Sequence, residues 1–440
     1  MSTTTLNPRA FFERTWKSRF ARNIALVASG AAGAQAITMA FSPIITRIYG
    51  PEAFGLLGTF MAIVAVATPL AALAYPIAIV LPRDDRDALG LVRLSLAISF
   101  AIALLAGALL WAGGDWLIGT LNAQSVASFL FLIPVAMLFA AWAQTAQQWL
   151  IRKKEFGVIA RISLAQSLIL NSAKTGIGWI NPAGAVLIVI STAGSLLNAA
   201  MMVIGAKRRH VPIQSHDKHR ARKPLRELAN RHRDFALYRA PQNFINAASQ
   251  SLPVLMLAAL FGPAAAGFYT LGKMVMGMPS ALMGKAVTDV FYPRITEAAH
   301  KGENLPRHIF LATSALLAIG ALPFGLVIIF GPWLFGFVFG QDWLMAGEYA
   351  RWLALFFLFN FINKPCVAAV PVLGIQRGLL VYEVFSTGSK ALGLVAGFYW
   401  FASDVWAVAL FSVLGVLAYS TMMLWIYSHA RRWNRDAKAS

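Results

Sequence analysis

Long apolar segments separated by short polar breaks run along most of the chain. Several stretches of more than 20 residues contain no Asp, Glu, Lys or Arg, and the longest of them covers residues 116–151. A helix that crosses the roughly 30 Å hydrocarbon core of a bilayer needs about 20 apolar residues. The pattern therefore predicts an all-α integral membrane protein with twelve spanning helices. We expect these spans near residues 24–46, 54–80, 90–112, 126–150, 157–179, 183–205, 240–260, 266–292, 308–330, 346–370, 377–399 and 405–428.

Lys and Arg residues collect in every second break between the predicted spans. Most of them lie in the N-terminal tail, in the even-numbered loops and in the C-terminal tail, and Arg47 and Arg351 are the exceptions at the outer ends of spans. The loops without Lys or Arg cover residues 113–125, 180–182, 261–265 and 400–404. Since cytoplasmic loops carry an excess of Lys and Arg, we expect both termini on the cytoplasmic side, an N-in and C-in topology.

The composition agrees with a membrane protein and excludes several other classes. Hydrophobic residues make up 58% of the chain and charged residues 13%, whereas soluble domains have about 25% charged residues. An ordinary soluble enzyme, a disordered protein and a small secreted scaffold are therefore excluded. The formal net charge is +20. Because the basic residues lie in the loops, we interpret them as topology determinants and contacts with anionic lipids, not as a nucleic-acid surface.

The predicted domain organisation is two six-helix bundles joined by a basic linker. The expected segments are a basic N-terminal tail at 1–23, a bundle at 24–205, a cytoplasmic linker at 206–239, a second bundle at 240–428 and a C-terminal tail at 429–440. Such bundles would leave a cavity between them, which is typical of a transporter.

Two short sequence matches at half-chain spacing indicate an internal duplication. The segment Gly50–Gly55 (GPEAFG) recurs as Gly262–Gly267 (GPAAAG) after 212 residues, and the pair Tyr75-Pro76 recurs as Tyr292-Pro293 after 217 residues. Both copies of the first motif join the first and second spans of a six-span set. An even number of spans gives the halves the same orientation, so we expect them to be related by an axis along the membrane normal.

The loop at residues 47–56 (RIYGPEAFGL) resembles the loop after the first helix of the polysaccharide flippases, the Wzx-like branch of the MOP superfamily. The second GPAAAG copy and the stretch Phe339–Trp343 are similar to the same family, although Ala264-Ala265 replaces an expected acidic residue. The resemblance implies a MOP/MATE-like fold. It also implies a polyprenyl-diphosphate-linked oligosaccharide as substrate, moved from the inner to the outer leaflet of the bacterial cytoplasmic (inner) membrane for surface polysaccharide synthesis.

Lysines inside the predicted spans are the main candidates for binding an anionic substrate. Placing an ionisable group at membrane depth costs about 2.5–3.5 kcal/mol on insertion scales, so such residues are first considered as functional. The candidates are Lys174, Lys273, Lys285, Lys364 and Lys390. Fixed cations in a water-filled cavity would replace part of the solvation of a diphosphate. For Lys174, which lies five residues before Trp179, snorkelling to the interface explains the residue equally well.

Two carboxylates, Asp289 and Glu383, accompany these lysines and are candidates for ion coupling. Glu383 and Lys390 are spaced i, i+7 on one helix face, and burial of Glu383 would raise its pKa. Lys285 and Asp289 are spaced i, i+4, so a local ion pair near the inner interface is the alternative for them. A packing role remains open for Glu383.

Side-chain amides are candidates for contacting sugar hydroxyls. They lie on the predicted fourth and seventh spans, toward the cytoplasmic side where a substrate would load. The set comprises Gln144, Gln147, Gln148, Asn243, Asn246 and Gln250. Hydrogen bonds between helices are the alternative role for these residues.

Signals for soluble enzyme chemistry are missing from the sequence. No Gly-rich phosphate loop followed by Lys-Ser or Lys-Thr occurs. The seven histidines lie in loops, tails or span ends, and we interpret Cys366 as a buried inert thiol. We therefore expect no enzyme activity, no cofactor and no metal site. The expected partners are the lipid-linked glycan, membrane lipids and a polysaccharide polymerase, around a monomeric transport unit.

A multidrug and toxin extrusion-type exporter of the same superfamily is the alternative function. Such exporters bind organic cations and need acids inside the membrane, whereas here the lysines within the spans outnumber the acids by three. The excess of positive charge therefore favours an anionic substrate.

Overall fold

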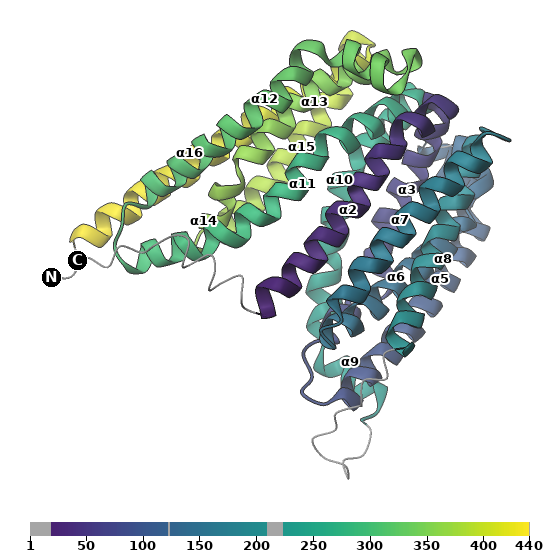
Figure 1. Ribbon diagram of the computed structural model, residues 1–440, viewed down its shortest axis with the longest axis horizontal. Coiled ribbons are helices and arrows are strands. Elements are labelled where there is room, and N and C mark those ends of the chain that lie inside the picture. Colours follow the sequence, from purple (N-terminus) through teal and green to yellow (C-terminus); the bar gives the residue numbers. More distant parts are fainter. Residues whose placement is uncertain (1–18, 122–123, 209–222, 440) are drawn as a thin grey trace. The chain divides into compact units, whose positions relative to one another are not determined.

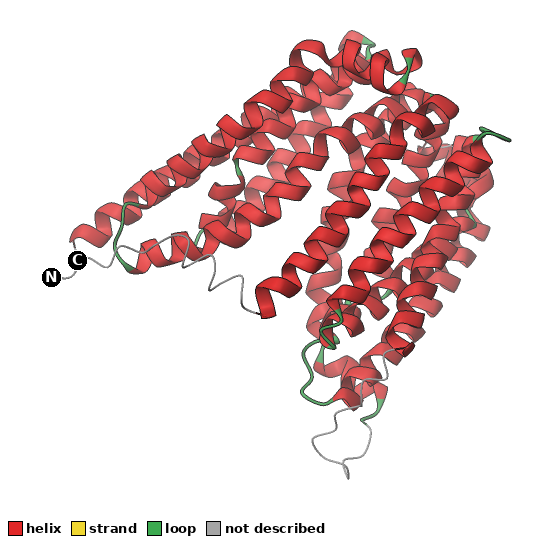
Figure 2. Ribbon diagram, viewed as in Figure 1, coloured by secondary structure: helices red, strands yellow, loops and turns green. Residues whose placement is uncertain are grey.

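The computed structural model describes residues 19–121, 124–208 and 223–439, and within them the side chains of residues 281–290 are not described. Every regular element in this part of the chain is a helix (Figure 2). Inside a bilayer the backbone has no water to bond, and a helix satisfies its own N–H and C=O groups. The long apolar segments therefore fold as helices.

By their internal contacts the residues form two compact units, described separately below. Unit 1 comprises residues 1–48 and 60–251, and unit 2 comprises 49–59 and 252–440. The boundaries that we expect at the linker remain a prediction, and the linker residues 209–222 lie outside the described part.

The helices α2 to α10 of the first half begin and end as follows: α2 (Arg19–Ile48), α3 (Pro51–Ala71), α4 (Tyr75–Ala78), α5 (Asp85–Leu121), η1 (Gln124–Phe129), α6 (Leu132–Arg152), α7 (Phe156–Gly178), α8 (Gly184–Arg208), α9 (Leu225–Arg231), η2 (Phe235–Arg239) and α10 (Ala240–Phe261). Those of the second half are α11 (Pro263–His300), α12 (Leu305–Phe339), η3 (Gln341–Trp343), α13 (Leu344–Ile362), α14 (Lys364–Leu373), α15 (Gln376–Phe401) and α16 (Asp404–Ala439).

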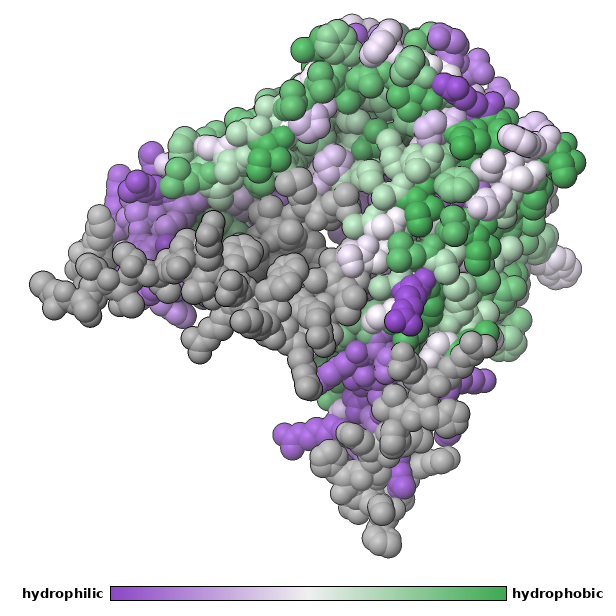
Figure 3. All heavy atoms as spheres, viewed as in Figure 1, coloured by the Kyte–Doolittle hydropathy of each residue, from purple (hydrophilic) through white to green (hydrophobic). Residues whose placement is uncertain are grey.

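Each predicted span coincides with one of these helices or with a pair of them. Among the described residues, eight helices are long and apolar enough to cross a membrane. The count of twelve spans therefore stays a prediction. In Figure 3, hydrophobic residues cover the middle of the helices on the visible face and hydrophilic residues gather toward their ends.

The predicted span at 126–150 divides between η1 and α6, and two further spans that the sequence predicts as continuous are interrupted in the structure. The span at 54–80 ends as α3 at Ala71, passes through Leu73 and Ala74 with φ of 47° and 57°, and resumes as the short α4. In the second half, the equivalent Tyr292-Pro293 lies inside the unbroken α11. The span at 346–370 divides at Asn363 into α13 and α14. Hydropathy misses the first break because the residues around Leu73 and Ala74 are apolar, and it misses the second because the polar pair Asn363-Lys364 is too short to end an apolar segment.

In unit 1, α2 packs along α7, and α6 packs against α5 and α8 (Figure 1). Polar side chains join α2 to α7 inside the bundle: Asn171 Nδ2 donates to Thr38 Oγ1 (3.3 Å), and the Ser167 hydroxyl donates to the carbonyl of Ala34 (2.8 Å). Such bonds hold membrane helices together where burial of apolar surface provides little force.

The predicted cytoplasmic end of unit 1 is closed by a charged cluster. Arg152, at the end of α6, donates to Asp85 Oδ1 (2.9 Å) and to the carbonyls of Ile79 (3.2 Å) and Pro82 (2.6 Å), and Lys153 Nζ lies 2.5 Å from Asp85 Oδ2. Asp85 thus has a structural role here.

In unit 2, α13 lies at the centre of the packing, against α11, α12 and α16, while α15 packs along α16. Pro51 begins α3 and Pro263 begins α11, a position where the missing N–H of proline costs nothing. The Phe54 ring packs edge-on against Trp343 with centroids 5.0 Å apart. The first turns of the two repeat copies therefore belong to one core.

Candidate functional site

Four of the candidate lysines lie in unit 2, and the three whose side chains are described lie on three different helices. Lys273 is on α11, Lys364 begins α14 and Lys390 is on α15, and all three are half-buried. They are packed against protein, whereas a lysine that served only as a surface residue would be exposed. Unit 2 therefore holds several cations within its helical layer.

Lys364 lies at the break between α13 and α14. Asn363, the residue of the break, is 2% exposed, and its Oδ1 has no hydrogen-bond donor among the described residues. Lys364 makes no ion pair with a carboxylate in the described part of the chain. A broken helix with buried polar groups at membrane depth is typical of transporter binding sites.

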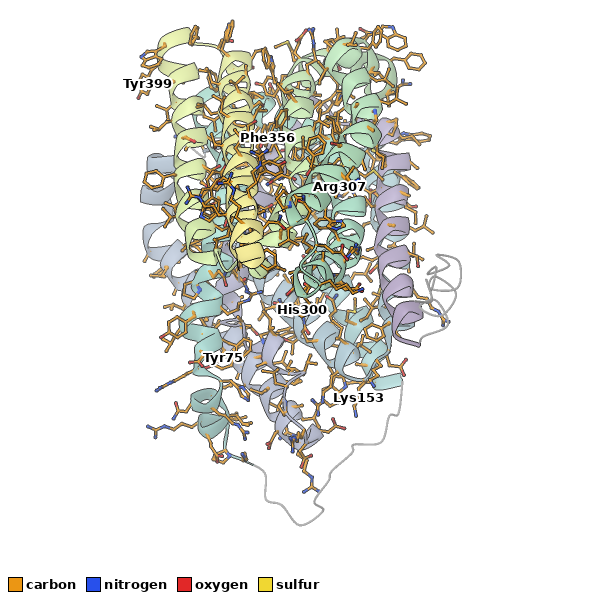
Figure 4. The ribbon with its side chains drawn as sticks, turned by 90° about the vertical axis from the view of Figure 1, so that its left-hand side faces the viewer. Tyr75, Lys153, His300, Arg307, Phe356 and Tyr399 are labelled. Atoms are coloured by element: carbon orange, nitrogen blue, oxygen red, sulfur yellow. The ribbon has the colours of Figure 1, made fainter. Side chains whose placement is uncertain are left out.

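Lys390 lies against a cluster of aromatic rings. Its Nζ is 5.8 Å from the ring centroid of Phe356 on α13, a cation–π geometry. The Phe356 ring contacts Phe411 (5.3 Å between centroids) and Tyr419 (5.5 Å) on α16. Asn360 Nδ2 donates to the Tyr419 hydroxyl at 2.5 Å. Lys390 on α15 thus lies against the Phe356 ring of α13 (labelled in Figure 4), and this ring belongs to an aromatic and polar cluster shared by α13 and α16.

Glu383 lies on the same helix as Lys390 and acts on it electrostatically, although no ion pair joins the two among the described residues. The charge of the same carboxylate also acts electrostatically on the Tyr419 hydroxyl. Glu383 is exposed at the surface of unit 2, and its expected desolvation stays a prediction. The spacing of seven residues leaves it two turns from the packed position of Lys390, so packing around Lys390 does not cover it.

Lys174 belongs to unit 1, on α7, where it is half-buried one turn after the buried Asn171. Both roles expected for Lys174, cavity lining and snorkelling, stay predictions. Lys285 and Asp289 lie on α11 within residues 281–290, whose side chains are outside the described part. Their predicted ion pair therefore also stays a prediction.

The six amides lie on α6 and α10 of unit 1. Gln144, Gln147 and Gln148 are half-buried on α6. On α10, Gln250 Nε2 donates to Asn246 Oδ1 (3.0 Å), and both residues are exposed. The structure therefore brings these two together along one helix, and the bond is not one between helices. Cavity lining by the amides remains a prediction.

Sequence reasoning missed the aromatic surroundings of Lys390. The signal available was the spacing of Phe356 and Asn360 on one helix and of Phe411, Gly415 and Tyr419 on another, each four residues apart. Such spacing identifies a helix face but not its partner. Cys366 is buried, as predicted, and the searched residues contain no cluster of three metal-ligating side chains.

A family model described as "Polysaccharide biosynthesis protein" matches residues 44–348, more than half of the chain. The chain belongs to the polysaccharide biosynthesis protein family. The succinoglycan biosynthesis transport protein ExoT of Rhizobium meliloti (strain 1021) is 23% identical over 367 residues, which cover 81% of this chain and 70% of ExoT. The predicted resemblance to proteins of polysaccharide biosynthesis is thereby confirmed.

Two solved structures show the fold. An inward-facing multidrug resistance MATE family transporter of the MOP superfamily has a TM-score of 0.68 at 14% identity, covering 93% of this chain and 95% of its own. The lipid II flippase MurJ in an inward closed conformation has a TM-score of 0.67 at 11% identity, covering 94% and 91%. The protein is a multi-pass membrane protein with the predicted all-α, MOP/MATE-like fold.

Proposed function

We propose that this family member is a flippase that moves a polyprenyl-diphosphate-linked oligosaccharide across the bacterial inner membrane for surface polysaccharide synthesis. Family membership and the similarity to a succinoglycan biosynthesis transport protein support a role in polysaccharide transport. The observation that carries the finer proposal is the set of half-buried lysines in unit 2, above all Lys364 and Lys390.

The physical argument concerns the headgroup of the substrate. A diphosphate is anionic and strongly hydrated, so moving it through a low-dielectric layer without compensation is prohibitive. Ammonium groups held by packed helices replace part of that hydration. Hydrogen bonds between charged partners contribute about 1.5–3 kcal/mol each. Lys364 makes no ion pair with a carboxylate in the described part of the chain. It is therefore a simpler partner for the diphosphate than Lys390, which Glu383 attracts.

The remaining parts of the substrate need other surroundings. The sugar hydroxyls would find amides on α6 and α10, and the polyprenyl tail would stay in the bilayer. In the proposed cycle the protein alternates between inward and outward access, and Glu383 and Asp289 are the candidates that couple this change to an ion gradient. A polysaccharide polymerase would receive the product, and one chain would suffice for transport.

Reconstitution into liposomes tests the proposal. A fluorescently labelled polyprenyl-diphosphate oligosaccharide is added to one leaflet, and an impermeant quencher reports its arrival in the other. We expect transport by the unmodified protein. The double variant Lys364→Ala with Lys390→Ala should be slower by roughly tenfold or more, because two charged contacts are lost.

Lys301→Ala is the matched control, because Lys301 is an exposed lysine at the end of α11 that pairs with Glu297. It should transport normally. Unimpaired transport by the double variant would overturn the cationic path. Liposomes that accumulate an organic cation such as ethidium, but do not move the lipid, would instead support the exporter.

A further inference from the structure

Phe356 and Gly415 together form a seat for the side chain of Lys390. The ring of Phe356 lies 5.8 Å from Lys390 Nζ. A Cβ atom built on Gly415 would lie 3.5 Å from Lys390 Cδ, so the stem of the lysine passes directly over this glycine. The seat thus contacts both the charged head and the stem, from α13 and α16.

The ring of Phe356 is itself held in place. It is 9% exposed and is contacted by the rings of Phe357 (5.3 Å), Phe411 (5.3 Å) and Tyr419 (5.5 Å). Figure 4 shows Phe356 between the end of unit 2 that carries Tyr399 and the end that carries His300. A ring fixed from several sides offers its face to the ammonium at one position.

Gly415 is required for this arrangement. A Cβ at this position would lie 2.4 Å from Phe356 Cδ2 and 2.6 Å from Cε2. These separations are shorter than carbon atoms tolerate, and the neighbouring rings restrict how far Phe356 can move. Any larger residue at 415 would therefore displace the ring and with it the site of the ammonium.

We propose that Phe356, seated on Gly415, is a positioning residue that holds the Lys390 ammonium where it meets the diphosphate of the substrate. The proposal rests on the flippase function proposed above. The stem of a lysine has four carbons and many rotamers, and Glu383 on the same helix attracts its charge. Without the aromatic face, the ammonium would spend part of its time away from the substrate path.

The test compares Phe356→Leu with Phe356→Tyr in the liposome assay. Phe356→Leu keeps an apolar side chain but removes the ring, and we expect its KM for the lipid-linked diphosphate to rise about 5- to 30-fold with a smaller change in kcat. Phe356→Tyr keeps the ring and should restore a KM close to that of the unmodified protein. Phe310→Leu, which removes an exposed ring on α12 that has no part in holding Phe356, is the control and should leave KM unchanged.

A double-variant cycle separates positioning from packing. In a Lys390→Ala background, Phe356→Leu should raise KM no further, since the group that it positions is gone. KM effects that multiply would mean that Phe356 acts independently of Lys390, and they would overturn the proposal. An equal rise in KM for Phe310→Leu would do the same.

Gly415→Ala provides a second route if Phe356→Leu fails to fold. It should raise KM as Phe356→Leu does and have no added effect beside Lys390→Ala. Gly388→Ala is its control, since a Cβ at this helical glycine of unit 2 would meet nothing within 4 Å. Failure of the unmodified protein to move the lipid would refute the function, whereas normal KM in Gly415→Ala and Phe356→Leu would refute only the positioning role.

Discussion

Gly55 and Gly267 occupy equivalent positions in the two repeat copies, and each packs against the first turn of the other copy's helix. A Cβ on Gly55 would lie 1.7 Å from the carbonyl oxygen of Pro263, and a Cβ on Gly267 would lie 2.0 Å from that of Pro51. The contact is reciprocal and lies within unit 2. A reciprocal contact of this kind is what a duplicated segment makes when its copies are related by a two-fold axis.

This contact predicts a large effect of the smallest possible substitution. Gly55→Ala and Gly267→Ala would each force a methyl group into a backbone carbonyl, which cannot rotate aside as a side chain can. We expect destabilisation by about 1–3 kcal/mol or more. The apparent melting temperature in detergent measures the effect. Gly325→Ala, where a Cβ would meet nothing within 4 Å, should melt like the unmodified protein, and equal melting of all three variants would contradict the tight contact.

The charged cluster at the end of α6 predicts a strong effect of neutralising Asp85. Asp85→Asn leaves Arg152 and Lys153 without their carboxylate in a largely buried setting, and breaking such a pair costs about 3–5 kcal/mol. Glu227→Gln is the control, because the exposed Glu227 pairs with Lys223 at 3.2 Å at the surface and should contribute little. Thermal unfolding followed by tryptophan fluorescence compares the two variants. Equal midpoints of unfolding would show that the charged cluster does not stabilise the fold.

The loop between α11 and α12 predicts a pH dependence below neutrality. Arg294 Nη2 donates to Glu303 Oε2 (2.7 Å), and this bond lowers the pKa of Glu303 from its usual 4.5, with a further contribution from His308. A carboxyl whose pKa is lower in the folded state stabilises the fold above its unfolded pKa, and this stabilisation disappears as the pH falls through the folded pKa.

The midpoint of unfolding should therefore fall as the pH drops below about 4.5. The fall should be smaller in Glu303→Gln, which has no carboxyl to protonate. Glu297, whose pKa is lowered by its bond to Lys301, still contributes in that variant. Identical pH profiles for the variant and the unmodified protein would be evidence against the interaction.

Tyr349 on α13 and Asp404 at the start of α16 predict a specific loss of stability near the predicted outer end of unit 2. The Tyr349 hydroxyl donates to Asp404 Oδ2 (2.7 Å), and Tyr349 is completely buried. Tyr349→Phe removes a hydrogen bond to a charged group and should cost about 1.5–3 kcal/mol. Tyr399→Phe, at an exposed tyrosine, should leave the midpoint of unfolding unchanged. A matching shift in both variants would point to a general effect of losing a hydroxyl.

The relation between Glu383 and Lys390 predicts that a substitution of Glu383 changes KM in the opposite direction to the substitutions of the lysines. Glu383→Gln removes the carboxylate that attracts Lys390, so KM for the lipid-linked diphosphate should fall. If Glu383 couples transport to an ion gradient, the variant should also lose acceleration by an imposed pH or sodium gradient. The liposome assay measures both quantities, and a raised KM with intact acceleration would exclude this role.

Most of the charged residues of the candidate site could be predicted from the sequence, but their neighbours in space could not. Lys390 and Glu383 stand out in the sequence because charge inside an apolar segment is costly whatever its neighbours are. The importance of Phe356 and Gly415 could not be read in the same way, since a phenylalanine and a glycine are ordinary residues of a membrane helix. Likewise, hydropathy gives no reason to break α3 at Ala72 to Ala74, where the chain is apolar throughout, and a polar pair as short as Asn363-Lys364 does not by itself end an apolar segment.

The sequence by itself determined that the protein is a helical membrane protein and where its helices lie. These properties depend on local hydropathy, and a bilayer accepts few other structures. The tertiary structure alone decided that the ring of Phe356 on α13 meets the ammonium of Lys390 on α15 over Gly415 on α16. It also decided that Gly55 meets Pro263. Apolar helix faces are interchangeable in a sequence pattern, and only the packing of their shapes selects which faces touch.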